Sequence, residues 1–268
     1  MSRKFRRIFK RTLWALFIVI AALVVTILFP QLLFASKVKY KKFTVCSNYK
    51  VSDDIKITLD NAMSLVEGSE LYDSGYNYNI ILCHNTFYNK IDDLLASGEA
   101  AATPRLHNVI VKVKIDPKSN LAFATFPKKC EVNLTFLLAH EMIHCLQAKK
   151  YGIIKFNPFS HPEFWKLEGY PEYISRKPQL LDKDYSLIKE IERYIELENK
   201  SINKWISTTE GGCESPGYYY KGRLMMEYLI DIKHQTYDQI LKDTVSETTI
   251  FKEMIKWKDS TGRSSISD

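Results

Sequence analysis

The residues with the clearest chemical potential are two histidines and a glutamate in the string His140-Glu141-Met142-Ile143-His144. Residues four apart lie on one face of a helix, so the imidazoles of His140 and His144 can bind one metal ion. Zinc binds imidazole nitrogen well, and in catalytic sites it keeps three protein ligands and a water. Glu141 is turned about 100° around the helix axis from His140, so we expect it beside the metal as a general base.

The alternative is that these are ordinary helix histidines beside a surface glutamate. The neighbouring residues argue against it, because they predict a buried helix, in which two imidazoles and a carboxylate need partners. These neighbours are Phe136, Leu137, Leu138, Ala139, Met142, Ile143 and Leu146. We therefore interpret the motif as a site for one zinc ion.

A third ligand must come from elsewhere in the chain. Metzincins have a glycine three residues after the second histidine and a third histidine three residues further on. Here these two positions hold Gln147 and Lys150. The metzincin arrangement is therefore excluded, and the third ligand has to be sought further downstream.

A downstream segment resembles the W-L-x-E-G-x-A-x-Y segment of the gluzincin metallopeptidases. The residues that match are Trp165, Glu168, Gly169 and Tyr173. Lys166 stands where that family usually has Leu, and Pro171 stands where Ala is common. The resemblance covers residues 121–175 and implies that Glu168, 24 positions after His144, is the third zinc ligand.

Other residues are candidates for supporting roles in such a site. Glu172 follows Glu168 by one helical turn, so it would either hold a ligand histidine by its other ring nitrogen or lie on a solvated helix surface. Gluzincins often have another donor that faces the oxyanion, which implies a role for His161 or for one of the tyrosines Tyr218, Tyr219 and Tyr220. Packing of aromatic rings at the start of a helix is the alternative for the tyrosines.

The resemblance implies a zinc-dependent peptidase with peptide or protein substrates. Glu141 would take a proton from the metal-activated water and pass it to the leaving amine. The family also implies a β-hairpin edge above the active-site helix, and residues 121–126 are placed to be that edge strand. Two alternatives remain open. One is a catalytically inactive zinc-binding membrane scaffold or sensor, and the other is a zinc hydrolase of non-peptide amides or esters.

The pattern of apolar residues predicts an α+β fold with the metal motif at the junction of two parts. An N-terminal α/β part would contain a small mixed sheet and an edge hairpin, and a helical part would follow. We expect strands at 42–46, 78–83, 108–115 and 121–126. We expect helices at 53–67, 86–96, 131–151, 163–176, 184–199, 218–233 and 237–258.

The N-terminal segment is predicted to cross a membrane. Residues 13–29 are apolar except for Thr26, and the apolar run resumes at 32–35, which is long enough for a span. A cleaved signal peptide is the alternative, but its apolar region would be shorter, and Leu33 is large for a cleavage site after Ala35. We therefore divide the chain into a basic head at 1–11, a transmembrane signal anchor at 12–35, a linker at 36–42 and a metallopeptidase domain at 43–268. The α/β part of this domain covers 43–130 and the helical part 131–268.

The positive charge is concentrated before this apolar run. Residues 1–11 carry six basic side chains and no acid, and without them the net charge of +7 falls to +1. The body therefore offers no basic surface for nucleic acid. Basic residues before the run favour a cytoplasmic N-terminus and an extracytoplasmic body. Lysines just after the run oppose this orientation; they are Lys37, Lys39, Lys41 and Lys42.

Five cysteines follow the apolar run: Cys46, Cys83, Cys130, Cys145 and Cys213. None forms a C-x-x-C pair, so a cysteine zinc site is not indicated. Cys46 and Cys83 each end a strand-like run, so one interpretation is a disulfide between them, which would support export. The other interpretation is five ordinary buried thiols.

Overall fold

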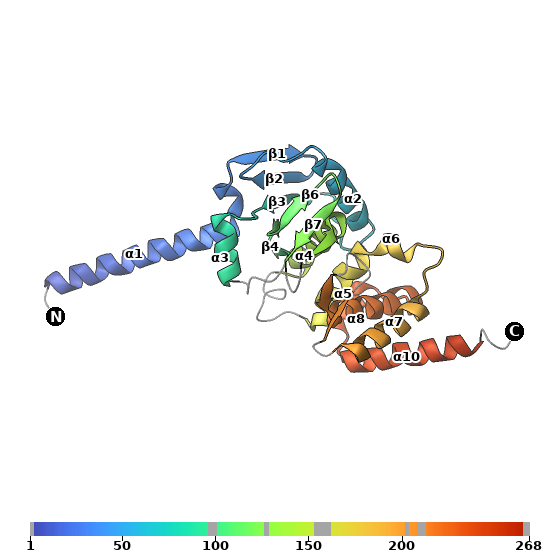
Figure 1. The fold of residues 1–268 in the computed structure, drawn as a ribbon. Coiled ribbons are helices and arrows are strands. Elements are labelled where there is room, and N and C mark those ends of the chain that lie inside the picture. The colour runs from blue at the N-terminus through green and yellow to red at the C-terminus, as the bar shows by residue number, and fades with distance from the viewer. Residues whose placement is uncertain are drawn as a thin grey trace.

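The computed structural model describes residues 3–95, 101–125, 129–152, 162–201, 204–207 and 213–264. Helix α1 (Arg3–Leu28) projects from the folded body, and the C-terminus lies at the far end of that body (Figure 1). Residues Arg7–Leu28 form a helix that is long and apolar enough to cross a membrane. The body is α+β, with strands mainly in its first half and helices in its second half, as the sequence predicts.

A mixed sheet forms the N-terminal half of the body. Within the described ranges its strand order is β1-β2-β3-β5-β4, with β2, β3 and β5 parallel and both edge strands antiparallel. These strands are β1 (Ser36–Tyr40), β2 (Phe43–Ser47), β3 (Tyr78–Leu82), β4 (Ala102–Arg105) and β5 (Asn108–Val111). The parallel strands are largely buried on both faces, which explains their apolar sequences.

Different helices cover the two faces of this sheet. They are α2 (Ile55–Glu67), α3 (Phe87–Leu95) and α4 (Leu134–Tyr151). Ile80 and Leu82 on β3 belong to the main core, together with buried residues of α2 and α4. Ile81 belongs to a separate cluster with Tyr88 of α3 and with Phe34. This division follows from the two-residue period of a strand, and it places the helix with the metal motif on one face of the sheet.

The helix formed by the apolar N-terminal segment ends earlier than the composition of the segment predicts. Helix α1 stops at Leu28, and a short 3-10 helix (η1, Pro30–Leu33) leads to Phe34, which is buried in the body. Pro30 accounts for the stop, because it has no N–H to continue the helix. The expected anchor at 12–35 is therefore too long, and the basic residues from Arg3 onward belong to the same helix as the apolar run.

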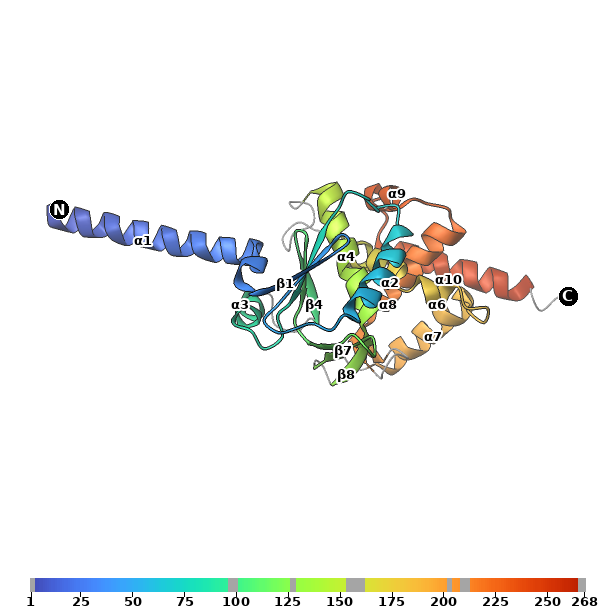
Figure 2. The same cartoon turned by 90° about the horizontal axis from the view of Figure 1, so that it is seen from above.

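The segment 36–42 is not a linker. It forms β1 and the turn to β2, with Val38 opposite Val45 and Tyr40 opposite Phe43. Its lysines indicated a polar linker, but lysine is also common on edge strands, where it prevents further strand pairing. The chain thus passes from α1 to the sheet through ordered structure, and α3 lies beside the C-terminal end of α1 in both views (Figures 1 and 2).

A second, antiparallel sheet corrects two further predictions. Within the described residues it has the order β6-β7-β8, from β6 (Lys114–Asp116), β7 (Leu121–Ala124) and β8 (Cys130–Asn133). The single strand expected at 108–115 is divided, because β5 pairs with β3 and β4 whereas β6 pairs with β7. The expected edge strand at 121–126 forms β7, which lies between two partners, so β8 is an edge instead. Residue 126 lies outside the described residues.

The C-terminal half is helical, with differences from the predicted boundaries. Its helices are α4, α5 (Phe164–Ser175), α6 (Lys177–Leu180), α7 (Leu187–Lys200), α8 (Gly217–Glu227), a π-helix (Tyr228–Ile232), α9 (Tyr237–Lys242) and α10 (Glu247–Ser264). The helix expected at 237–258 is divided into α9 and α10, and the one expected from 131 begins at Leu134, after β8. Two short strands, β9 (Trp205–Ser207) and β10 (Glu214–Pro216), were not predicted and pair with each other.

Helices α5 and α8 touch through their backbones at two glycines. A Cβ atom added to Gly169 would lie 2.6 Å from the carbonyl carbon and oxygen of Gly222. A Cβ atom added to Gly222 would lie 3.1 Å from Cα of Gly169. Because only glycine permits this approach, the pair sets the distance between the helix that carries Glu168 and the helix that carries Tyr219.

The cysteines pair differently from the suggested bridge. Among the described residues, a disulfide joins Cys130 on β8 to Cys213, which directly precedes β10. Cys46 and Cys83 are buried thiols in the cluster on the α3 face of the sheet. The Cys83 thiol donates to the carbonyl of Val111 on β5 at 3.4 Å, so it is directed away from Cys46 on β2.

The buried Glu227 on α8 makes the stability of the fold depend on pH. Burial raises its pKa from 4.5 to about 7, although the Tyr185 hydroxyl donates to it at 2.6 Å and Arg223 lies nearby. The folded state therefore favours the protonated acid, and this contribution to stability is complete below 4.5 and is lost as the pH rises through 7. We expect wild type to lose about 2 kcal/mol more of its free energy of unfolding between about pH 5 and about pH 8 than Glu227→Gln.

Urea unfolding of both full-length chains in mild detergent at the two pH values measures this difference. The glutamine side chain of the variant keeps an acceptor for Tyr185 and does not ionise. The variant therefore retains the hydrogen bond and lacks only the titration. Equal pH dependence of the two chains would contradict the assignment.

Candidate metal centre

Helix α4 carries both histidines of the motif. Its first turn is capped by Asn133, whose side chain accepts a hydrogen bond from the N–H of Phe136 at 3.1 Å. Packing on the sheet buries nearly the whole central part of the helix, including His140 and His144. The two rings lie one turn apart with their centroids separated by 4.8 Å. The packing of α4 in the core therefore fixes the positions of both imidazoles.

Glu168 on α5 meets the two imidazoles. Its Oε2 atom lies 3.2 Å from Nε2 of His140 and 3.0 Å from Nε2 of His144, and the two Nε2 atoms are 3.1 Å apart. Tetrahedral ligands at about 2.0–2.1 Å from a zinc ion lie about 3.3 Å from one another. The three atoms thus fit the spacing of ligands around one ion, and this buried group could hold a metal.

Contacts on the far side of each ring determine which nitrogen faces this point. Nδ1 of His140 lies 3.2 Å from Oε1 of Glu172, and Nδ1 of His144 lies 2.7 Å from Oε1 of Gln147. Both oxygens are acceptors, so in the neutral ring each Nδ1 carries the hydrogen and each Nε2 presents a lone pair to Glu168. Three electron-pair donors that face one point are the donor set of a metal site.

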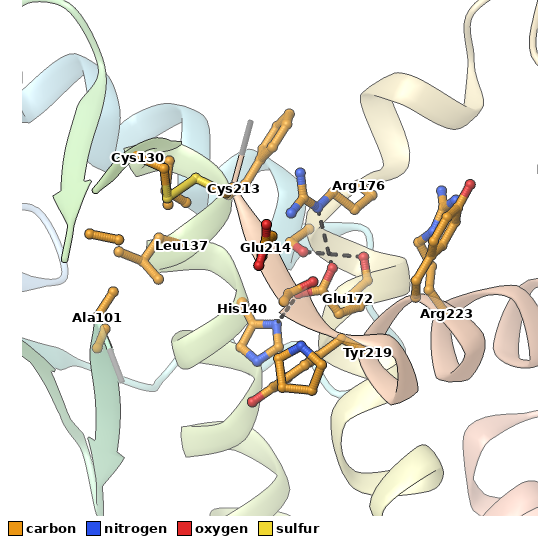
Figure 3. A pocket seen from close by; sticks show the side chains of 18 of the residues that line it. Ala101, Cys130, Leu137, His140, Glu172, Arg176, Cys213, Glu214, Tyr219 and Arg223 are labelled. Atoms are coloured by element: carbon orange, nitrogen blue, oxygen red, sulfur yellow. Dashed lines mark hydrogen bonds and ion pairs between the residues drawn. A yellow bond between two sulfur atoms is a disulfide. The ribbon is translucent and has the colours of Figure 1, made fainter. Parts of the chain in front are cut away.

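Glu172 is itself held by a cation. Nε of Arg176 lies 3.3 Å from Oε2 of Glu172, and the guanidinium lies over the ring of Phe136, 5.3 Å from its centroid. Figure 3 shows the resulting chain from Arg176 through Glu172 to His140. Of the two interpretations of Glu172, this geometry favours the partner of a histidine over the solvated surface.

Gln147 connects His144 to the neighbouring helix. Its side-chain nitrogen donates to the carbonyl of Leu167 at 3.0 Å and to the hydroxyl of Tyr237 at 2.7 Å. In a regular helix the Leu167 carbonyl would accept from the N–H of residue 171, but Pro171 has none. Pro171 lies inside α5 and not in its first turn. The Leu167 carbonyl therefore has no backbone donor within the helix, and its bond to Gln147 helps to orient that side chain.

The charges of the cluster shift the pKa values of its members. Burial lowers the pKa of His140, but Glu168 and Glu172 outweigh it and raise that pKa to about 10. Burial raises the pKa of Glu172, whereas Arg176 and His140 lower it to about 2. The two histidines likewise hold the pKa of Glu168 below its usual range, against the effect of burial. Both carboxylates are therefore ionised at neutral pH and attract positive charge to the imidazoles.

A cavity of about 510 Å³ adjoins the cluster. His140 and Glu141 of α4 line it, together with Tyr218 and Tyr219 of α8. The ring centroid of Tyr219 lies 6.0 Å from that of His140 and 4.7 Å from that of Tyr218. Burial and then Glu168 raise the pKa of Tyr219 well above its usual value. Its hydroxyl therefore keeps its hydrogen and can donate to a group in the cavity.

The structure brings most of the predicted site residues together and leaves one undescribed. The residues that meet at the cluster or line the cavity are His140, Glu141, His144, Glu168, Glu172, Tyr218 and Tyr219. His161 lies outside the described residues. Sequence reasoning missed Gln147 and Arg176, although Gln147 follows His144 by three residues and Arg176 follows Glu172 by four. The signal for Gln147 was Pro171, whose position in a helix requires another donor for the carbonyl of Leu167.

We expect Gln147→Met to lower the affinity of the candidate metal centre for a divalent cation, with Zn²⁺ as the probe, by about 10–100-fold, because the partner that orients His144 is lost. Competition with a chelator of known affinity measures the change. Tyr237→Phe is the matched control, since it removes another bond of the Gln147 amide but leaves the bond to His144. Equal affinity of wild type and Gln147→Met would show that Gln147 does not position the ring.

The geometry of the cluster fits a metal centre, and the comparisons with known proteins add no relative. No protein-family model, no curated protein and no solved structure matches the chain. A function is therefore inferred from the donor atoms, their outer partners and the adjoining cavity.

Proposed function

We propose that the chain is a zinc-dependent peptidase. The observation that carries the proposal is the convergence of Nε2 of His140, Nε2 of His144 and Oε2 of Glu168 within 3.2 Å of one another, beside a cavity that Glu141 lines. Two nitrogens and one carboxylate oxygen are a donor set that suits zinc, and a catalytic zinc site has three protein ligands. The resemblance of residues 121–175 to gluzincins supports the same ligands.

Each residue has a distinct task in this proposal. A bound zinc ion would supply Lewis acidity and a lowered pKa for water. Glu141 accepts a proton from the attacking water and returns it to the leaving amine. The Tyr219 hydroxyl donates to the oxygen that gains charge when the carbonyl is attacked. Glu172 and Gln147 hold the ligand rings in orientation.

We further propose that α1 anchors the enzyme in a membrane with the body on the extracytoplasmic side. The basic residues at the start of α1 support a cytoplasmic N-terminus. The disulfide between Cys130 and Cys213 supports an oxidising compartment for the body, because reducing compartments keep such thiols unpaired. The substrate would be a peptide or protein in that compartment.

Metal content and turnover of the purified full-length chain test the proposal. We expect one zinc per wild-type chain, and hydrolysis of members of a peptide library detected by mass spectrometry. Glu168→Ala should lose the zinc, whereas Glu196→Gln, on the exposed face of α7, should keep both zinc and activity. Wild type without stoichiometric zinc would overturn the proposal. Zinc with cleavage only of non-peptide amides or esters would favour that kind of hydrolase, and zinc without turnover would favour a scaffold.

A further inference from the structure

The C-terminal end of α1 is bonded to the folded body. The hydroxyl of Tyr88 donates to the carbonyl of Ile27 at 3.4 Å, and the side-chain amide of Asn108 donates to the carbonyl of Leu28 at 3.1 Å. The last carbonyls of a helix have no partner within the helix, so here the body supplies their donors. Because Asn108 begins β5 and Tyr88 is on α3, the helix is attached to two separate elements of the body.

The residues between α1 and the sheet are packed into the body and do not form a flexible connection. Pro30 is buried, and Phe34 is buried in a cluster with Tyr88 and Ile81. Strand β1 starts at Ser36, directly after this cluster. The direction of α1 relative to the body is therefore set by packing and hydrogen bonds, and a bilayer crossed by α1 has a defined position relative to the body.

Exposed apolar side chains surround the place where α1 joins the body. Phe29 is 40% exposed, Leu32 65%, Leu33 45% and Phe87 75%. Phe29 follows the last residue of α1, and Phe87 precedes Tyr88, which contacts the last turn of α1. Figures 1 and 2 both show α3 beside that end of the helix. Large exposed apolar side chains that gather at one place indicate a surface with a partner.

The length of the span identifies this partner as a lipid bilayer. The uncharged part of α1, residues 12–28, extends about 25 Å, somewhat less than the hydrocarbon core of about 30 Å. Residues that follow Leu28 directly then lie at the boundary between acyl chains and headgroups, where aromatic side chains are favoured. The exposed lysines Lys37 and Lys39 on β1 come next along the chain, where they can meet lipid phosphates.

We propose that Phe29, Leu32, Leu33 and Phe87 form a membrane-contact surface that inserts into the boundary of the bilayer that α1 crosses. This inference rests on the membrane anchor of the proposed function. It adds that the body lies against the lipid and does not move freely on a tether. The cavity is consequently held at a constant distance from the membrane, which favours substrates whose cleaved segment lies at that distance.

Tryptophan fluorescence of the full-length chain in vesicles tests the surface. The vesicles contain phosphatidylcholine and phosphatidylglycerol, with or without bromine on acyl carbons near the headgroup, which quenches indole on contact. Phe87→Trp is the reporter, made together with Trp14→Phe to remove the tryptophan of the span. Leu181→Trp in the same background is the matched control, because Leu181 is 82% exposed and follows α6, away from α1 (Figure 1).

We expect the emission added by Phe87→Trp to shift to shorter wavelength in vesicles and to be lost with the brominated lipid. The emission added by Leu181→Trp should show neither change. Unquenched emission from Phe87→Trp would overturn the membrane-contact surface. The anchor is tested separately by Trp14 of the wild-type chain, since lipid brominated along the acyl chains should quench it whether or not the body touches the bilayer. Zinc content is measured on the same samples. Absence of zinc would then contradict the peptidase proposal independently of the quenching result for the membrane-contact surface.

Discussion

Glu141→Gln is expected to keep its zinc and to hydrolyse peptides about 10²–10⁴-fold more slowly than wild type. Glu141 is one residue after His140 on α4 and lines the cavity, but it does not belong to the three residues that could hold the metal. Glutamine has nearly the same shape as glutamate and cannot accept a proton from water. The substitution therefore removes the proposed base and leaves the donor set intact.

Zinc content and single-turnover hydrolysis of a cleaved peptide measure the two halves of this prediction. Glu131→Gln is the matched control, because Glu131 lines the same cavity from β8 and is exposed. We expect that control to keep zinc and to retain turnover near the wild-type rate. Activity of Glu141→Gln close to wild type would remove Glu141 from the mechanism, and loss of zinc would show that it contributes to binding the metal.

The part of the site that sequence could predict is the part that depends on local geometry. His140 and His144 meet because four residues make about one helical turn, and Glu172 follows Glu168 by the same rule. That α5 approaches α4 at all came from a resemblance and not from spacing. Arg176 and Gln147 were missed, although each lies one helical turn from its partner, Glu172 or His144. Sequence does not give their contacts with the neighbouring helix, which are those of Arg176 with Phe136 and of Gln147 with Leu167.

The same distinction applies to the fold. Buried strands such as β3 have mostly apolar sequences that predict a strand, whereas the alternating lysines of β1 predict a polar linker. The strands β8, β9 and β10 are short, with pairing partners that sequence alone does not identify. The disulfide between Cys130 and Cys213 joins residues 83 positions apart, and only the assembled cavity wall brings them together.

Gly169→Ala is expected to lower the free energy of unfolding by about 3 kcal/mol, the upper part of the usual range for overpacking. Alanine is the better helix former by about 1 kcal/mol, so a helix with open space beside this position would gain stability. Here the added Cβ would lie 2.6 Å from backbone atoms of Gly222, which cannot move without α8. The steric effect therefore outweighs the gain in helix propensity.

The same substitution should also weaken zinc binding, because the site is built from both sides of this contact. Separation of α5 and α8 displaces Glu168, which adjoins Gly169, and Tyr219, which lies one turn before Gly222. Gly75→Ala is the control, since its Cβ would approach only a side-chain oxygen of Asp73, at 3.2 Å. Urea unfolding and chelator competition on the full-length chain measure both effects. If Gly169→Ala unfolds at the wild-type urea concentration with unchanged zinc affinity, the helices do not approach as closely as described, and the glycine pair does not determine the position of Glu168.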